Sequence, residues 1–351
     1  MTEPPSETET SAETETTAVT EALAEPEAAP PVPDYSPEAR RKAARMRAMD
    51  PALAPPPRNR GWKRGVEIAR MTLSGTWNDG FVHAGNLAYT ALFALFPFFI
   101  FGAAVFSVLG ETDDRATAID AVVRALPLSV GRVIGPVAHE VINARSGWLL
   151  WIGALFALWT VGGLVETIRD ILRRAYGTTP TRGFWFHRMT STGIIVGAVL
   201  MLMLALLAQV MIGAVEEFIA AFVPDLSDIL GGLALSRIVP TAAVYGSIFL
   251  LFLSLTPAAY RGKKYPKWPG AVLVTVWWMA VTIAFPPLLR SVFAYNLTYG
   301  SLAGIMITLF FFWLIGLGVV AGAELNAALA STPEEEGAAT ASTILQEESA
   351  Q

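Results

Sequence analysis

The chain has 351 residues, of which 53% are hydrophobic and 16% are charged. A soluble domain of this length carries about 25% charged residues, so the composition indicates a membrane protein rather than a water-soluble fold. The absence of cysteine excludes disulfides, Fe–S clusters, thiolate zinc sites and cysteine nucleophiles. The net charge of −5 averages acidic segments at 1–39 and 330–351 with an excess of Lys and Arg between them.

Residues 1–60 are predicted to form a disordered tail that is first acidic and then basic. Residues 1–38 are rich in Glu, Thr, Pro and Ala, and they cannot bury enough apolar surface to offset the entropy lost on ordering. The basic stretch at 39–50 is compatible with a short helix, which would be either a lipid-surface anchor or a solvated linker. Residues 330–351, with five acidic and no basic residues, are predicted to form a second disordered tail.

Residues 61–80 are predicted to form an interfacial amphipathic helix. Apolar residues recur there at spacings of three or four, which places them on one helical face. They are Trp62, Val66, Ala69, Leu73 and Trp77. Lys63, Arg64 and Arg70 lie off this stripe, where long side chains can reach lipid phosphates. We therefore expect this helix to lie on an anionic inner leaflet.

Residues 81–329 are predicted to form an all-α transmembrane domain with six spans. Each span reaches about the 20 residues that a helix needs to cross the hydrocarbon core. The spans lie near 87–110, 148–167, 190–213, 238–256, 270–289 and 300–326. Two connections, 128–144 and 216–230, mix apolar and polar residues, and we expect short amphipathic helices there on the outer face.

The distribution of Lys and Arg predicts the orientation of these spans. Nineteen basic residues fall before the first span and in the second and fourth connections, and six fall on the opposite side. By the positive-inside rule, both termini are expected in the cytoplasm, which agrees with an even number of spans.

Six polar residues are expected at one depth, near the inner boundary of the membrane. They are Asn86, Tyr89, Glu166, Arg169, Glu324 and Asn326. Glu324 lies 22 residues beyond Leu302, roughly 33 Å along a helix, so its carboxylate is expected at the inner headgroups and not at the midplane. Glu166 and Arg169 are spaced for an ion pair on one helical face. The set would either line a vestibule open to the cytoplasm or only satisfy helix ends and ion pairs.

Glycines and prolines predict how the spans pack and bend. Small-xxx-small motifs allow close helix approach. Their glycines are Gly193, Gly197, Gly300, Gly304, Gly318 and Gly322. Prolines inside the expected spans should kink or end their helices. These are Pro97, Pro286 and Pro287, and the kinks would either gate a cavity or belong to a static bundle.

Enzyme signatures are poor in this sequence. The three histidines are scattered, and the HExxH, GxSxG, P-loop and GxGxxG patterns are missing. A metal-dependent nuclease needs clustered carboxylates, which the spacing of the acidic residues does not indicate. We therefore expect no enzymatic activity, no catalytic residue, no metal, no cofactor and no nucleic-acid partner.

Four segments of the body carry distinctive motifs in a fixed order. They are GNLAYTALFALFP (85–97), LWTVGGLVETIRDILRRAYGTTPTRGFW (158–185), KKYPKWPGAVLVTVWW (263–278) and YNLTYGSLAGIMITLFFFWLIGLGVVAGAELNAAL (295–329). Together they resemble the YihY/BrkB family of bacterial inner-membrane proteins, over roughly residues 60–329. The resemblance implies a polytopic α-helical protein of the inner membrane whose molecular activity is poorly established. Parts of the family have carried a ribonuclease label, and one branch has a link to serum resistance.

The resemblance extends to individual positions in these segments. They are Tyr89, Pro97, Glu166, Tyr176, Pro269, Gly270, Tyr295, Asn296, Tyr299, Gly300, Gly322, Glu324, Leu325 and Asn326. Two functions remain open on this basis. The first is transport or lipid and envelope handling through a cytoplasm-facing polar vestibule, with anionic inner-leaflet lipids and an unidentified small-molecule or lipid substrate as partners. The second is a non-catalytic membrane scaffold whose acidic tails bind cytoplasmic partners. A homo-oligomer is compatible with either.

Overall fold

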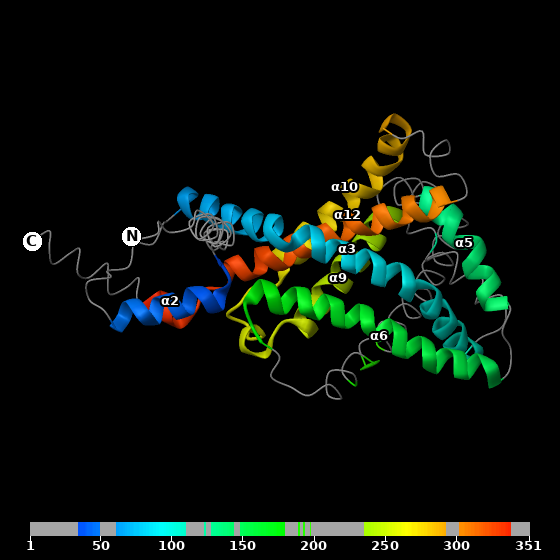
Figure 1. The fold of residues 1–351 in the computed structure, drawn as a ribbon, viewed down its shortest axis with the longest axis horizontal. Helices are drawn as coiled ribbons and strands as arrows, with labels where there is room; N and C mark the ends of the chain where they lie inside the picture. Colours follow the sequence, from blue (N-terminus) through cyan, green and yellow to red (C-terminus); the bar gives the residue numbers. More distant parts are fainter. Residues whose placement is uncertain are drawn as a thin grey trace, which may run out of the picture. The chain divides into compact units, whose positions relative to one another are not determined.

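The computed structural model describes six stretches of the chain and five isolated residues. They are 34–49, 61–109, 128–143, 148–179, 235–292 and 302–337, with Val123, Met189, Thr192, Gly193 and Gly197. Within these residues the secondary structure is helical and contains no strand, as the all-α prediction requires. The helices belong to the compact unit formed by residues 35–351 (Figure 1).

Long helices make up most of the described structure. They are α2 (Pro37–Met49), α3 (Trp62–Leu109), α5 (Leu128–Asn143), α6 (Trp148–Tyr176), α9 (Leu235–Leu255), α10 (Trp268–Val292) and α12 (Ala303–Leu329). A 3₁₀ turn at Ala258–Tyr260 lies between α9 and α10, and residues 333–337 form a further helical turn. Figure 1 shows α3, α6 and α12 running alongside one another, and α5, which forms where an outer helix was predicted, packs against α3 and α12.

Four stretches are long and apolar enough to cross a membrane. They are Gly80–Phe101, Trp151–Tyr176, Trp268–Leu289 and Ala303–Leu329. They correspond to the predicted spans at 87–110, 148–167, 270–289 and 300–326. In α9, the predicted span at 238–256 contains a shorter apolar stretch, Val244–Leu255. The predicted span at 190–213 lies almost entirely, and the outer helix at 216–230 entirely, outside the described residues.

α3 is a single helix of 48 residues, where we predicted an interfacial helix at 61–80 followed by a separate span. At about 1.5 Å per residue it is roughly 72 Å long, more than twice the thickness of the hydrocarbon core. A change from an amphipathic to an apolar pattern does not interrupt the backbone hydrogen bonds, so the boundary does not form. The predicted apolar stripe is exposed, with Trp62, Leu73 and Trp77 at 85%, 70% and 73%.

The prolines do not end the helices that contain them. α3 continues from Pro97 to Leu109, and α10 continues through Pro286 and Pro287 to Val292. Neighbouring helices and local adjustments of the backbone can satisfy the carbonyl groups that a proline frees in a membrane helix.

Order also extends into both segments that we predicted to be disordered. Residues 37–49 form α2 within the predicted tail 1–60, and residues 333–337 form a turn within the predicted tail 330–351. Thr332 begins this turn with a capping box: its N–H donates to Glu335 Oε2 at 2.8 Å, and the Glu335 N–H donates to Thr332 Oγ1 at 3.4 Å. The contacts between the two segments, described below, supply the stabilisation that their composition alone lacks.

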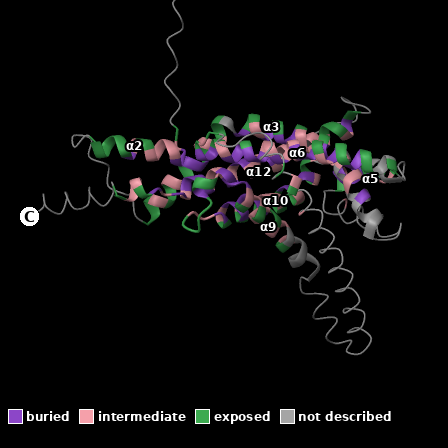
Figure 2. Ribbon diagram, turned by 90° about the horizontal axis from the view of Figure 1, so that it is seen from below, coloured by how far each residue is buried: buried purple, intermediate pink, exposed green. Residues whose placement is uncertain are grey.

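Small residues bring α3 and α12 close together in antiparallel order. An added methyl group at Gly316 would lie 3.0 Å from the carbonyl oxygen of Ala84, and one at Gly80 would lie 3.5 Å from Val320 Cγ1. Residue numbers therefore rise along α3 as they fall along α12. Figure 2 shows the buried residues gathered where α3, α6 and α12 face one another.

The glycines with predicted packing roles differ in their surroundings. A methyl group added at Gly318 would collide with Trp277, and one added at Gly322 would come too close to Val274. One added at Gly304 would lie 2.8 Å from Val133. Nothing described lies within 4 Å of such a group at Gly193 or Gly197. Gly300 is outside the described residues.

Candidate functional site

The last turns of α6 carry a cluster of charged side chains. Glu166 pairs with Arg169, as their spacing predicts, and also accepts a hydrogen bond from Arg173 Nη1 at 3.2 Å. The same Arg173 nitrogen lies 2.7 Å from Asp170 Oδ1. The cluster is inside the stretch Trp151–Tyr176, which is apolar enough to span a membrane.

Arg169 is the most deeply buried member of this α6 cluster. Its side chain is 7% exposed, against 35% for Glu166 and 60% for Asp170. Removing a guanidinium from water costs several kcal/mol, in rough terms, unless partners compensate. The carboxylate of Glu166 is therefore a requirement for placing Arg169 in this environment.

The first turns of α6 have a different character. Their exposed side chains are large and apolar, as expected for a surface that faces lipid. They are Trp148, Trp151, Ile152, Leu155, Phe156 and Trp159. Glu166 follows Trp151 by 15 residues, roughly 22 Å along the helix, so the charges lie towards one end of the span.

Glu324 lies in the interface between α12 and α3. Its carboxylate occupies the space beside Gly75, and a methyl group added at Gly75 would collide with it. The residue is half-buried. A glycine at this point of α3 is thus what leaves room for the charged group.

Asn326 joins α12 to the first turn of α10. It is 1% exposed; its Oδ1 accepts a hydrogen bond from the Gly270 N–H at 2.8 Å, and its Nδ2 donates to the Lys267 carbonyl at 3.1 Å. The first N–H groups of a helix have no partner within the helix, and Asn326 supplies one for α10. Both the oxygen and the nitrogen of the Asn326 amide bond to backbone groups of the protein, so the residue has a structural role.

Asn86 and Tyr89 are on α3, away from the level of Glu324. Both are exposed, and the ring of Tyr89 contacts Phe93 with centroids 4.6 Å apart. Because Glu324 lies beside Gly75, Asn86 is 11 residues and roughly 16 Å further along α3. The structure pairs Glu166 with Arg169, places Glu324 beside Gly75 of α3, and joins Asn326 to the start of α10.

A second polar cluster lies where α2 meets the end of α12. Arg40 Nη2 donates to the carbonyls of Ala327 and Ala330 at 3.0 and 2.9 Å, and Nη1 donates to Ala328 at 3.3 Å. The Ala327 carbonyl also accepts from the Ala330 N–H at 3.1 Å, so Arg40 adds a donor at the end of the helix, where a cation complements the negative end of the helix dipole. Burial lowers the pKa of Arg40, although the nearby Glu335 carboxylate acts in the opposite direction.

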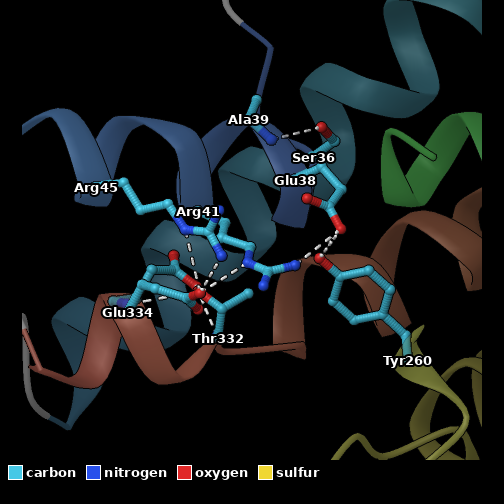
Figure 3. Close-up of polar contacts among 9 residues, drawn as sticks. Ser36, Glu38, Ala39, Arg41, Arg45, Tyr260, Thr332 and Glu334 are labelled. Carbon is cyan, nitrogen blue, oxygen red and sulfur yellow. Dashed lines mark hydrogen bonds and ion pairs between the residues drawn. The ribbon is translucent and has the colours of Figure 1, made fainter. Parts of the chain in front are cut away.

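Glu334 is the acidic centre of the α2 contact, as Figure 3 shows. Arg41 Nε and Arg45 Nη2 reach its Oε1 at 2.9 and 2.7 Å. The hydrogen bond from Arg45, together with a backbone hydrogen bond and one from Arg41, lowers the pKa of Glu334 to about 2. Arg41 also pairs with Glu38 at 3.5 Å, and the Tyr260 hydroxyl donates to Glu38 at 3.0 Å.

Two further cations bind backbone carbonyls near the start of α10. Lys267 Nζ donates to Arg261 and Gly262 at 2.8 and 2.7 Å, and burial lowers its pKa. Arg261 Nη2 donates to Ser254 and Thr256, at the end of α9, at 2.8 and 3.1 Å. Sequence reasoning missed these roles and that of Arg40, because its only signal was an excess of basic residues.

No group of three His, Asp or Glu residues that could hold a metal ion occurs among the residues that the structure describes. In the described residues, apolar helices carry ion pairs and capped ends at the end of α6, the start of α10 and the end of α12.

Residues 74–344 match the virulence factor BrkB family. The chain belongs to this family.

A BrkB-family relationship also agrees with the apolar helices, which identify the chain as a membrane protein. The chain is 29% identical over 255 residues to the ribonuclease-like protein YfkH of Bacillus subtilis (strain 168), covering 72% of this chain and 91% of YfkH. No solved structure matches the chain.

Proposed function

We propose that this BrkB-family protein crosses the bacterial inner membrane six times, keeps both termini in the cytoplasm, and transports or handles a lipid-like or small-molecule substrate at the α6 cluster. The observation that carries the proposal is Arg169, which is buried and paired with the half-buried Glu166 inside a helix apolar enough to span a membrane. Ionisable side chains are expensive in a span, and they usually face the bundle interior or an aqueous path that carries a substrate.

The position of the charges supports the proposed orientation. α6 ends, α10 begins and α12 ends near the same group of basic residues, in which Arg40, Arg261 and Lys267 bind carbonyls. An excess of Lys and Arg on one side is typical of the cytoplasmic side of a membrane protein. Reporter fusions after Thr179 and after Gly337 test this, since both should report the cytoplasm; a periplasmic signal at either position would contradict it.

A charge swap separates a substrate site from a simple ion pair. If Glu166 and the arginines beside it only neutralise one another, the variant Glu166→Arg with Arg169→Glu and Arg173→Gln should retain activity. It preserves one ion pair in reversed order and removes the arginine that contacts position 166. If the cluster contacts a charged substrate, the swapped protein should reach wild-type abundance in the membrane and lose at least about tenfold in activity, the effect of roughly 1.4 kcal/mol.

The activity is measured as complementation of a strain that lacks the gene for this protein. Untargeted lipid and metabolite profiling identifies the compounds that change, and complementation with the wild type should restore them. The charge-swapped variant and Glu166→Gln should fail to do so, whereas Glu67→Gln, which removes an exposed carboxylate paired with Arg64, should succeed. Equal restoration by all variants would contradict the proposal.

A scaffold is the second candidate, and one observation favours it. α2 and residues 331–337, the two described segments that border the acidic parts of the sequence, contact each other. Such a pair could recruit a basic cytoplasmic partner. Deleting 1–33 and 338–351 should abolish function if the protein is a scaffold, and should leave function intact if the α6 cluster is the site.

The ribonuclease-like name is that of YfkH, and no contact described in this chain favours RNA cleavage.

A further inference from the structure

Part of α3 exposes polar side chains within the stretch that is apolar enough to span a membrane. Asn86 and Tyr89 lie inside Gly80–Phe101, and both are exposed, Tyr89 at 55%. No hydrogen bond joins the side-chain amide of Asn86 to another residue that the structure describes. What this amide contacts in the cell depends on its depth in the membrane.

Contacts between α3 and α12 give the depth of Asn86. Ala84 packs against Gly316, where an added methyl group would lie 3.0 Å from the Ala84 carbonyl oxygen. Gly316 is the middle residue of the apolar stretch Ala303–Leu329, with 13 residues on either side. Asn86 follows Ala84 by two residues, roughly 3 Å along the helix. It therefore lies close to the level of the middle of the α12 span.

An amide at this depth is costly to leave without a hydrogen-bond partner. The hydrocarbon core contains no water, and an amide transferred into an apolar medium without a compensating hydrogen bond is strongly destabilised. The Asn86 side chain is also too short to reach the headgroups, as a lysine or arginine would. Polar side chains in membrane spans accordingly face other helices and pair there. We therefore expect the surface around Asn86 to be covered in the membrane.

The residues around Asn86 have the spacing of a seam between two helices. Val82, Asn86, Tyr89 and Phe93 follow one another at intervals of four, three and four, and they fall within about 60° around the helix. Val82 and Phe93 are exposed at 74% and 57%. These intervals are those of the a and d positions of a coiled coil, and they place Asn86 and Phe93 at a positions. A single Asn at an a position fixes the register and the number of helices in a parallel pair.

We propose that this face of α3, formed by Val82, Asn86, Tyr89 and Phe93, packs against the same face of a second copy of the chain, with the two Asn86 amides hydrogen-bonded to each other. All copies insert into the membrane in one orientation, so the two α3 helices run parallel about a two-fold axis along the membrane normal. Identical residues then meet at the same depth. An Asn amide carries both a donor and an acceptor, so it complements its own image.

A second copy fits this face better than a charged small molecule does. None of its four residues is charged, and the alternating intervals of three and four suit another helix. The ring of Phe93 lies against that of Tyr89, with centroids 4.6 Å apart, which gives the seam a firm apolar side. α6 and α12 pack against α3 through other residues, among them the buried Leu87 and Ala94, so a second copy displaces neither helix. The inference goes beyond the proposed function and does not depend on the α6 cluster.

Cross-linking in native membranes tests the geometry. The chain has no cysteine, so Val82→Cys places one thiol per chain at a d position of the seam. Mild oxidation should join two chains through a disulfide. Leu155→Cys, at 72% exposure on α6, is the control, and it should cross-link at least about tenfold more slowly because its thiols do not come within disulfide distance. Equal rates would show random collision, and no product at Val82→Cys would leave the face to another occupant; either result overturns the proposal.

A dilution series in proteoliposomes tests the role of the amide. Energy transfer between chains with donor and acceptor labels is measured as the protein-to-lipid ratio falls. Asn86→Leu should weaken the association by at least about fivefold, the contribution of a hydrogen bond between membrane helices in model peptides. Asn86→Gln, which keeps an amide, should retain most of it. Equal association of the wild type and Asn86→Leu would overturn the proposal. The copies should separate on dilution in detergent, where Asn86 is again an exposed residue.

Discussion

Asn326 Oδ1 accepts a 2.8 Å hydrogen bond from the backbone N–H of Gly270, 56 residues earlier in the chain. The glycine is part of the same arrangement, because a methyl group at position 270 would overlap the Asn326 amide and the Gly322 carbonyl. The side chain of Asn326 and the absence of a side chain at Gly270 therefore hold the start of α10 against the end of α12.

Asn326→Ala should destabilise the protein strongly. The substitution leaves the Gly270 N–H buried without this partner, whereas the Lys267 carbonyl keeps the N–H of Ala271. One orphaned buried group costs about 1–3 kcal/mol, and we expect the free energy of unfolding in detergent to fall by that amount. Thermal unfolding followed by circular dichroism measures it, with Asn86→Ala, at an exposed position of α3, as the matched control. An equal shift in both variants would contradict the assignment.

Gly75→Ala should destabilise the α3–α12 interface because the new methyl group meets the Glu324 carboxylate. Overpacking of this kind typically costs about 1–3 kcal/mol. Glu324→Ala in the same chain should recover most of that loss, since it removes the obstacle. The double-mutant cycle is read from unfolding temperatures. Additive effects would mean that the two side chains do not share this space.

Arg40→Gln should loosen the end of α12. It removes the charged cap from the carbonyls of Ala327, Ala328 and Ala330 at the end of α12, of which Ala327 keeps the N–H of Ala330 as a donor. Hydrogen exchange of the α12 C-terminal turns should become at least about fivefold faster, as expected for a loss of roughly 1 kcal/mol. Lys42→Gln, at an exposed position of α2, should leave the exchange unchanged.

The contact between α2 and Glu334 should fail only in acid. The pKa of Glu334 is lowered from 4.5 to about 2 in the folded chain, so the stabilisation is complete above 4.5 and is lost as the pH falls towards 2. Pepsin, which is active in acid, should cleave α2 faster as the pH falls from 4.5 towards 2. A protease active at neutral pH should cleave α2 at the same rate between pH 8 and pH 5. Glu334→Gln, which lacks the carboxylate, should be cleaved rapidly by pepsin already at pH 4.5. Release of α2 near neutral pH would contradict this prediction.

The part of the exposed apolar stripe nearest the span, at Leu73 and Trp77, should contact lipid where the continuous helix leaves the bilayer. A spin label at Leu73→Cys, a 70% exposed position, should be more accessible to oxygen than to a water-soluble nickel complex in proteoliposomes. A label at Lys63→Cys, off the stripe, should show the reverse order. Greater accessibility to nickel at both positions would place the stripe in water.

Local patterns in the sequence predicted local structure well. The Glu166–Arg169 pair follows from a spacing of three, and the apolar stretches of α3, α6, α10 and α12 follow from composition. Contacts between distant segments could not be predicted in this way. Arg40 and its carbonyl partners are separated by up to 290 residues, and nothing near Arg40 distinguishes it from the other arginines of its basic patch.

The predicted break before the first span was wrong for a related reason. A periodicity test detects a change in what surrounds a helix, such as water giving way to lipid, but the backbone can continue through that change. α3 shows this, because its pattern changes between Trp77 and Leu87 while its hydrogen bonds do not. Composition likewise assigned residues 37–49 to a disordered tail, although their contacts with the end of α12 order them as α2.

The continuity of α3 gives the protein a rigid lever. The 18 residues from Trp62 to Asp79 precede its membrane-spanning stretch, and they extend roughly 27 Å from it without a joint. A change of about 10° in the tilt of the span moves the tip of such a lever by roughly 5 Å. Small adjustments among the packed helices are thereby amplified at Trp62.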